Sequence, residues 1–365
     1  MKEHNESDIK IEIIDKNMKP TKRSKKNLKW LSPIEHPFRL TGFPWISRDK
    51  VYRRLPLNPT VKITEAVDIL ANHTAGGQIC FQTNTTTLSI RVNLIARANM
   101  CHMPATGQCG FDCYIGDPEQ LYYCSTTKYN NMEASYDCTF FEFENSSITR
   151  NIVINFPLYQ GVKDILIGVD EHAKVIEPPA LKNDKRIIFY GTSITQGGCA
   201  SRPGMAYTNI ISRRLNVECI NLGFSGNGRG EPEMAKIITE IEKPGCIVLD
   251  YEANSEELFF DTLPRFINII RGACPEVPIL VVSKIPYAME FHNNKMLKKR
   301  IEKKKFQVEM IELLKDKGDK FIHFFDGEDL LGSNFHECTV DGVHPTDLGF
   351  MHMADRLTPI INNII

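Results

Sequence analysis

The C-terminal half of the chain alternates short apolar runs with longer segments of helical pattern, and this rhythm restricts the possible folds most strongly. The apolar runs cover 187–190, 217–222, 246–249, 279–282 and 321–325. The clearest helical pattern covers 295–317, where apolar residues recur on one face and lysines cover much of the rest. Such alternation predicts an α/β domain with a mostly parallel, doubly wound sheet. In sheets of this kind, ligands bind beyond the carboxyl ends of the strands.

The preceding part of the chain has the pattern of an all-β domain. Residues 88–94 alternate apolar and polar side chains strictly, as a half-buried strand does. Glycine-containing turns at 76–77 and 106–107 separate other short runs. Short strands at this spacing predict a two-sheet sandwich of jelly-roll type over residues 31–170.

A polar segment joins the two patterns. Residues 171–185 contain Pro178 and Pro179 among several charged residues, which is typical of a linker. Residues 1–30 are polar and carry a basic cluster, and we interpret them as a lead-in. The 365 residues are therefore predicted to hold a β-sandwich domain at 31–170 and an α/β domain at 186–365.

Charge and cysteine content exclude several classes of function. The formal net charge is −1, and the basic cluster near the N-terminus lacks interleaved aromatic residues, so we expect no nucleic-acid partner. The chain shows neither an apolar signal segment nor an uncharged apolar stretch of about 18 residues, so we expect no membrane partner. The 11 cysteines, an odd number without a Cys-x-x-Cys pair, are typical of reduced thiols in a cytoplasmic protein, and their spacing predicts no metal site.

Three residues have the chemistry of a covalent hydrolase. Ser193 lies in a turn of small residues that follows the apolar run 187–190, so its hydroxyl is expected at the carboxyl edge of the sheet. A serine hydroxyl is a weak nucleophile and needs an adjacent base. His344 is the candidate base, and Asp341 lies three residues upstream, close enough to orient the imidazole ring. Nucleophile, base and base-orienting carboxylate are the set required for acyl transfer.

Two further segments offer hydrogen-bond donors for an oxyanion. Gly226 follows the run 217–222, and a glycine exposes its backbone N–H without obstruction. Asn254 follows the run 246–249 and supplies a side-chain amide, while the N–H of Ser193 is the third donor. Individually, Ser193 or Asn254 could instead cap a helix and Gly226 could lie in a flexible loop. Their joint occurrence favours a hydrolase site.

These segments resemble the sequence blocks of the SGNH hydrolases, also called the GDSL esterase/lipase superfamily. The matching segments are Gly191-Thr192-Ser193, Gly226, Asn254 and Asp341-Gly342-Val343-His344-Pro345. The resemblance implies a three-layer α/β/α domain, a catalytic triad of Ser193, His344 and Asp341, and an oxyanion hole of Ser193, Gly226 and Asn254. It implies no metal and no cofactor.

The β domain also resembles a known companion of these enzymes. Residues 103–107 and the segment Gly110-Phe111-Asp112-Cys113-Tyr114 are similar to the small β domain with a Gly-x-Asp-Leu-Tyr signature that precedes some SGNH esterases. Cys113 replaces the leucine, and the exchange of one apolar residue for another should leave the fold intact.

Two residues are candidates for substrate binding. The usual third block of the superfamily is Gly-x-Asn-Asp, and here Glu252 replaces the glycine and Ser255 the aspartate. Glu252 could bind a substrate hydroxyl or a cation, or it could cap the neighbouring helix. Trp45 could stack on a sugar ring, or it could belong to the core, where such aromatic residues lie more often.

The sequence thus predicts a serine esterase that hydrolyses a small polar acyl ester, such as an O-acetylated sugar or metabolite, through an acyl-enzyme on Ser193. An acyltransferase would use the same intermediate with an alcohol as acceptor. A carbohydrate-binding protein with a vestigial site is the alternative from another class. The expected partner is a small-molecule ester, and the oligomeric state is left open.

Overall fold

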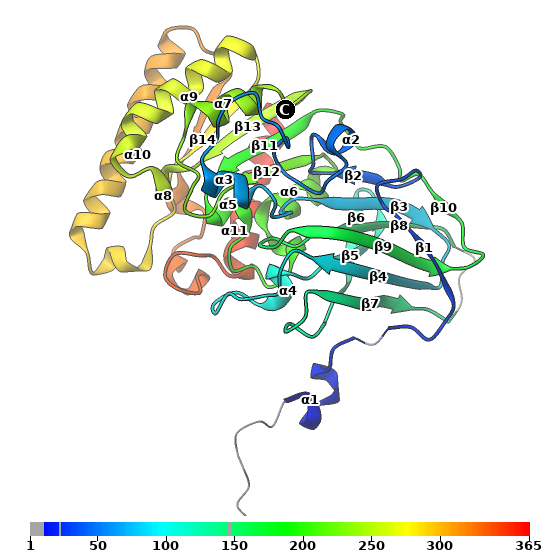
Figure 1. Cartoon of the computed structure of the whole chain (residues 1–365). Coiled ribbons are helices and arrows are strands. Elements are labelled where there is room, and N and C mark those ends of the chain that lie inside the picture. Colours follow the sequence, from blue (N-terminus) through cyan, green and yellow to red (C-terminus); the bar gives the residue numbers. More distant parts are fainter. Residues whose placement is uncertain (1–10, 22, 145–147) are drawn as a thin grey trace, which may run out of the picture.

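The computed structural model describes residues 11–21, 23–144 and 148–365, and it contains three β-sheets (Figure 1). The first ten residues of the predicted lead-in lie outside the described residues. Within the described part of the lead-in, two short helices precede the first strand, namely α1 (Ile11–Ile14) and η2 (Lys16–Met18).

Two antiparallel sheets form the N-terminal half, as the strand pattern predicted. The first sheet has the strand order β1 (Leu28–Leu31), β9 (Val162–Asp170), β4 (Thr87–Leu94) and β7 (Ser135–Glu142). The second has the order β10 (Val175–Ile176), β3 (Gln78–Thr83), β8 (Arg150–Asn155), β5 (Asp112–Asp117) and β6 (Gln120–Thr126), with β2 (Arg39–Thr41) also paired to β3. Three short helices lie between these strands: α2 (Ile46–Asp49), α3 (Glu65–Leu70) and α4 (Ala105–Gln108).

Alternation along the strands builds the core of this half. In β4, Leu88, Ile90 and Val92 are fully buried and pack with apolar residues of β3, β8 and β9 in one cluster. The two sheets therefore share one apolar interior, which is the arrangement of a sandwich. Strand β1 begins at Leu28, within the predicted lead-in, and β10 lies within the predicted linker. The domain boundaries themselves stay a prediction.

The C-terminal half is the predicted α/β domain with one parallel sheet. The strand order is β12 (Cys219–Gly223), β11 (Arg186–Gly191), β13 (Pro244–Asp250), β14 (Ile279–Val282) and β15 (Ile322–Phe325). The α-helices are α5 (Ser193–Gln196), α6 (Tyr207–Leu215), α7 (Pro232–Thr239), α8 (Glu252–Ser255), α9 (Phe259–Ala273), α10 (Asn294–Asp316) and α11 (Asp347–Ile364). The short helices η3 (Pro203–Met205), η4 (Glu256–Leu258), η5 (Ala288–Phe291), η6 (Gly327–Asp329) and η7 (Phe335–Cys338) lie in the connections.

Successive residues of each parallel strand face opposite helical layers. Ile187 and Phe189 of β11 belong to a cluster that includes α6 and α11. Ile188 and Tyr190 belong to another, which includes α7, α9 and α10. Both faces of the sheet are therefore apolar and covered, which explains why its strands read as continuous apolar runs rather than as alternating ones. None of the helices in the described ranges combines the length and apolar character needed to cross a bilayer.

A buried arginine joins the two halves at the carboxyl end of strand β12. Arg54 is fully buried, and its guanidinium donates hydrogen bonds to the backbone carbonyls of Asn221 at 3.1 Å and Gly223 at 2.6 Å, both in β12. It also donates to the carbonyls of Leu70 and His73 in the N-terminal half, each at 2.7 Å. Because the hydrogen bonds to Asn221 and Gly223 are buried, the guanidinium takes the place of water as the donor to these two carbonyls.

Replacing Arg54 should therefore destabilise the whole chain. We expect Arg54→Ala to lower the free energy of unfolding by about 3 kcal/mol or more, because it removes the donor from the buried carbonyls of Asn221 and Gly223. Urea unfolding followed by fluorescence measures this. The matched control is Arg48→Ala, whose side chain is 58% exposed and pairs with the adjacent Asp49. Equal midpoints for the two variants would contradict the assigned role.

Candidate active site

Ser193 is the first residue of helix α5, directly after strand β11. The helix cap is its neighbour Thr192, whose hydroxyl accepts a hydrogen bond from the N–H of Ile194 at 3.3 Å. The hydroxyl of Thr195 in turn accepts from the N–H of Thr192 at 3.2 Å, which completes a capping box. Since capping is done by Thr192, the hydroxyl of Ser193 remains available for a different partner.

That partner is His344, which lies 151 residues further along the chain. Oγ of Ser193 lies 2.9 Å from Nε2 of His344, and Nδ1 of His344 lies 2.7 Å from Oδ2 of Asp341. The other carboxylate oxygen of Asp341 accepts hydrogen bonds from the backbone N–H groups of Val343 at 3.0 Å and His344 at 2.8 Å. The structure thus brings together all three residues that the sequence proposed as nucleophile, base and orienting carboxylate.

The charge on Asp341 is stabilised by its surroundings. Partial burial alone would raise the pKa of this carboxyl, but hydrogen bonds from the backbone and ring of His344 outweigh that effect and hold the pKa below its ordinary value of 3.8. The carboxylate is therefore ionised at neutral pH. An ionised acceptor at Nδ1 keeps the proton on that nitrogen and leaves the lone pair of Nε2 directed at the serine.

Gly226 and Asn254 lie against each other at the same edge of the sheet. Gly226 has a φ of +68°, in the left-handed region that favours glycine. One atom of the Asn254 amide lies 3.2 Å from the backbone nitrogen of Gly226. With its oxygen turned there, the amide accepts the Gly226 N–H. With its nitrogen turned there, the amide donates to the backbone carbonyl of Phe224 at 3.4 Å, and it and the Gly226 N–H are two donors at one place.

Asn254 does not play the capping role considered from sequence alone. The cap of helix α8 is Tyr251 and that of the following helix η4 is Ser255, so Asn254 caps neither. The loop of Gly226 is tied to helix α5, because the N–H of Ser225 donates to Oε1 of Gln196 at 3.1 Å. The loop is therefore anchored next to the serine turn.

A partly buried acid, Asp250, lies next to the serine turn. Oδ2 of Asp250 accepts hydrogen bonds from the hydroxyls of Tyr207 at 3.0 Å and Thr195 at 3.2 Å. Burial raises the pKa of Asp250 to about 7, although these two hydrogen bonds act in the opposite direction. This cluster connects the end of β13 with helices α5 and α6. Only its position after an apolar run marked Asp250 in the sequence.

The β domain also supports the serine turn, through contacts that the sequence did not predict. The hydroxyl of Tyr159 donates to the backbone carbonyl of Ser193 at 3.1 Å. Nε2 of Gln196 donates to the carbonyl of Leu158 at 3.0 Å and lies 3.1 Å from Nδ1 of His73. Leu158, Tyr159 and His73 lie in irregular segments, where no periodic pattern could have identified them.

The signature segment of the β domain contacts the same region. Asp112 is fully buried, and its Oδ2 accepts from Nη1 of Arg202 at 2.7 Å and from the N–H of Gly204 at 2.8 Å. The same guanidinium donates to the hydroxyl of Tyr114 at 2.6 Å. The aspartate and tyrosine of the signature therefore hold the chain that follows helix α5, which gives this motif a structural role.

The two proposed substrate-binding residues are engaged elsewhere. Glu252 is 2% exposed, and its Oε2 accepts from the N–H of Lys284 at 2.8 Å and from Nε2 of Gln307 at 2.9 Å. Trp45 is 8% exposed and belongs to the apolar cluster between the parallel sheet and helices α7, α9 and α10. The structure thus places both side chains in internal packing, and we do not carry either into the proposed site.

Comparison with known proteins agrees with this architecture. Residues 184–362 match the GDSL-like Lipase/Acylhydrolase family, and residues 28–175 match the N-terminus of the Esterase_SGNH_hydro-type (GxDLY) family. A protein of Bacteroides ovatus ATCC 8483, assigned provisionally as a GDSL-like lipase, is 26% identical, with a TM-score of 0.85 over 93% of this chain and 98% of its own. No curated protein sequence gives a significant match.

More distant structures share the fold over the same extent. The salicylyl-acyltransferase SsfX3 from a tetracycline biosynthetic pathway is 17% identical, with a TM-score of 0.75. A family two carbohydrate esterase from Cellvibrio japonicus is 14% identical, with a TM-score of 0.59. Each covers 93% of this chain and 98% of its own length. Both halves of the chain are therefore found together in these relatives.

The oxyanion role of Asn254 can be tested by removing its amide. We expect Asn254→Ala to lower kcat about 10²–10³-fold with little change in KM, because the lost hydrogen bond forms mainly in the transition state. Steady-state kinetics with p-nitrophenyl acetate gives both constants. Ser255→Ala, on the same helix, is the control and should retain activity. A loss of less than about tenfold for Asn254→Ala would exclude the role.

The raised pKa of Asp250 predicts a pH-dependent stability. The pKa of Asp250 is about 7 in the folded chain and 3.8 in its ordinary state. Between these values the unfolded chain loses the proton more readily than the folded chain, so a rise in pH favours unfolding. We expect the stability of the wild type relative to Asp250→Asn to fall between about pH 4 and pH 7. Urea unfolding of both proteins across this range measures it, and a constant difference would contradict the prediction.

Proposed function

Because the chain belongs to the GDSL-like lipase/acylhydrolase family and carries the N-terminal domain of SGNH-type esterases, we propose that it hydrolyses small polar esters through an acyl-enzyme on Ser193. The observation that carries the proposal is the continuous series of contacts from Oγ of Ser193 through the ring of His344 to the carboxylate of Asp341, at 2.9 and 2.7 Å. Such a series activates a hydroxyl that is otherwise a weak nucleophile.

In the proposed mechanism, Oγ of Ser193 attacks the ester carbonyl while Nε2 of His344 takes its proton. Asp341 stabilises the imidazolium that results. The N–H groups of Ser193 and Gly226 and the amide of Asn254 stabilise the negative charge on the carbonyl oxygen by donating hydrogen bonds to it. The imidazolium then returns its proton to the leaving alcohol, and water activated by the same ring releases the acid.

The groups next to the serine favour a polar substrate. They include the amide of Asn254, which adjoins Gly226, and the imidazole of His102, whose ring centre lies 5.8 Å from that of His344. The side chains of His344 and Asp341 are 22% and 36% exposed, so water reaches the base. Access of water to the base favours hydrolysis over transfer to an alcohol.

The distant structural relatives define which substrates to test. One acts on carbohydrate esters and another transfers an acyl group, although at 14% and 17% identity they share only the fold with this chain. A panel of O-acetylated sugars and short acyl esters, assayed with and without alcohol acceptors, distinguishes the two activities. We expect free acid as the main product, and a predominance of transferred ester would favour the acyltransferase.

The assignment of Ser193 is tested by Ser193→Ala. We expect turnover of p-nitrophenyl acetate to fall by at least about 10³-fold, because the nucleophile is lost while the fold is kept. A fluorophosphonate probe should label the wild type and not the variant. Ser225→Ala, in the adjacent loop, is the control that should remain active and labelled. Equal turnover of the wild type and Ser193→Ala would reject the proposal, and an unlabelled wild type would favour the carbohydrate-binding alternative.

A further inference from the structure

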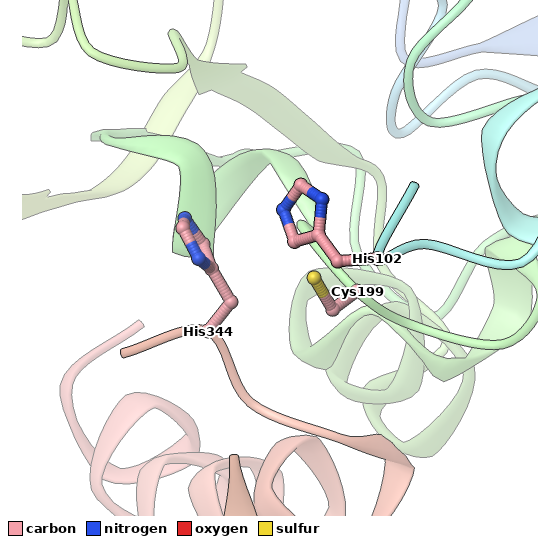
Figure 2. A group of neighbouring side chains, drawn as sticks. All are labelled: His102, Cys199 and His344. Atoms are coloured by element: carbon pink, nitrogen blue, oxygen red, sulfur yellow. The ribbon is translucent and has the colours of Figure 1, made fainter. Parts of the chain in front are cut away.

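Three potential metal ligands gather beside the candidate catalytic serine. His102 comes from the loop before helix α4, Cys199 from the segment after helix α5, and His344 from the loop before helix α11. One ligand atom from each lies within 4.8 Å of the others. Figure 2 shows the ring of His102 directed toward His344, with the sulfur of Cys199 near both rings. The sequence predicted no metal site, because these residues are far apart along the chain.

The donor set selects a particular class of metal ion. Imidazole nitrogen and thiolate sulfur are ligands that Zn²⁺ and similar borderline-soft ions prefer over Mg²⁺ or Ca²⁺. Three protein ligands with a water molecule in the fourth position are a common arrangement for Zn²⁺. In tetrahedral zinc sites, ligand atoms lie about 3.5 Å apart, so closing this site requires shifts of about 1 Å.

His344 is already prepared to act as a ligand. Its Nδ1 is held by the carboxylate of Asp341 at 2.7 Å, and this bond directs the lone pair of Nε2 outward. Metal-binding histidines commonly carry such a carboxylate on the nitrogen that does not bind the metal. In the free chain, that lone pair faces Oγ of Ser193 at 2.9 Å. A metal ion bound at Nε2 would therefore compete with the serine for this atom.

Cys199 is held in an unusual backbone conformation beside this histidine. Its φ is +76°, in the left-handed region that residues other than glycine rarely adopt, and its side chain is buried. Strained positions of this kind cluster at functional sites. The preceding residue, Gly198, is close to the same ring, since a Cβ there would lie 3.2 Å from Cδ2 of His344. The segment thus holds the thiol next to the base.

We propose that His102, Cys199 and His344 form an inhibitory site for Zn²⁺ or a similar thiophilic divalent cation. The inference rests on the proposed function, because the site regulates the same base. On binding, a bond forms between the metal and Sγ of Cys199, and the thiol proton passes to solvent. His102 and His344 each donate a nitrogen lone pair, and the hydrogen bond from Ser193 to His344 breaks. The serine then has no base, and activity stops until the metal is removed.

The experiment combines inhibition with a direct spectroscopic signal. Zn²⁺ is titrated into the full chain during p-nitrophenyl acetate hydrolysis, with subtraction of the metal-catalysed background, and a chelator is then added. We expect inhibition that the chelator reverses. In Cys199→Ser, which should keep basal activity, the Zn²⁺ concentration for half inhibition should rise by at least about tenfold. His102→Gln, measured relative to its own activity without metal, should show the same rise. The control Cys274→Ser replaces a cysteine outside the site and should behave as the wild type.

Substitution with Co²⁺ tests the site independently of catalysis. We expect a thiolate-to-cobalt charge-transfer band in the wild type, and its loss in Cys199→Ser but not in Cys274→Ser. An active enzyme without this band, or equal zinc sensitivity of all variants, would overturn the inference and leave the proposed function standing. An inactive wild type that still shows the Cys199-dependent band would retain the metal site and reject the proposed function.

Discussion

The parallel register of the C-terminal sheet is the constraint on which the candidate site depends. Gly191 of β11 pairs with Gly223 of β12 on one side and with Asp250 of β13 on the other. The three strands therefore end next to one another at the same edge of the sheet. The segments that carry Ser193, Gly226 and Asn254 begin there side by side. His344 reaches the same edge after β15. Residues separated by 151 positions meet because the strands that precede them are in register.

The sequence predicted those strands and helices that a local pattern of apolar residues identifies. Continuous apolar runs identified the parallel strands, because strands covered on both faces need no polar alternation. The helix predicted over 295–317 is α10, which spans Asn294–Asp316. Ser193 was found because it follows an apolar run, and His344 and Asp341 were found from their spacing of three residues. The roles assigned to them in catalysis remain proposals.

The supporting contacts could not be predicted, since they depend on how the two halves pack. Nothing around Tyr159 or Arg54 in the sequence indicates that each will donate a hydrogen bond to a backbone carbonyl on the other half of the chain. Glu252 illustrates the converse. A carboxylate next to Asn254 suggested substrate binding, yet its oxygen is engaged by Lys284 and Gln307, two residues far along the chain. Tertiary contacts, rather than sequence neighbours, decide what such a group does.

The ion pair between Asp112 and Arg202 has a consequence for how this architecture can diversify. It joins a strand of the β sandwich to the segment behind the serine turn, and Asp112 is wholly shielded from solvent. If an unrelated domain replaced the sandwich, Arg202 would lose its carboxylate partner and the segment would lose this contact. The sandwich and the segment that it holds can therefore change only together, whether or not the sandwich ever touches a substrate.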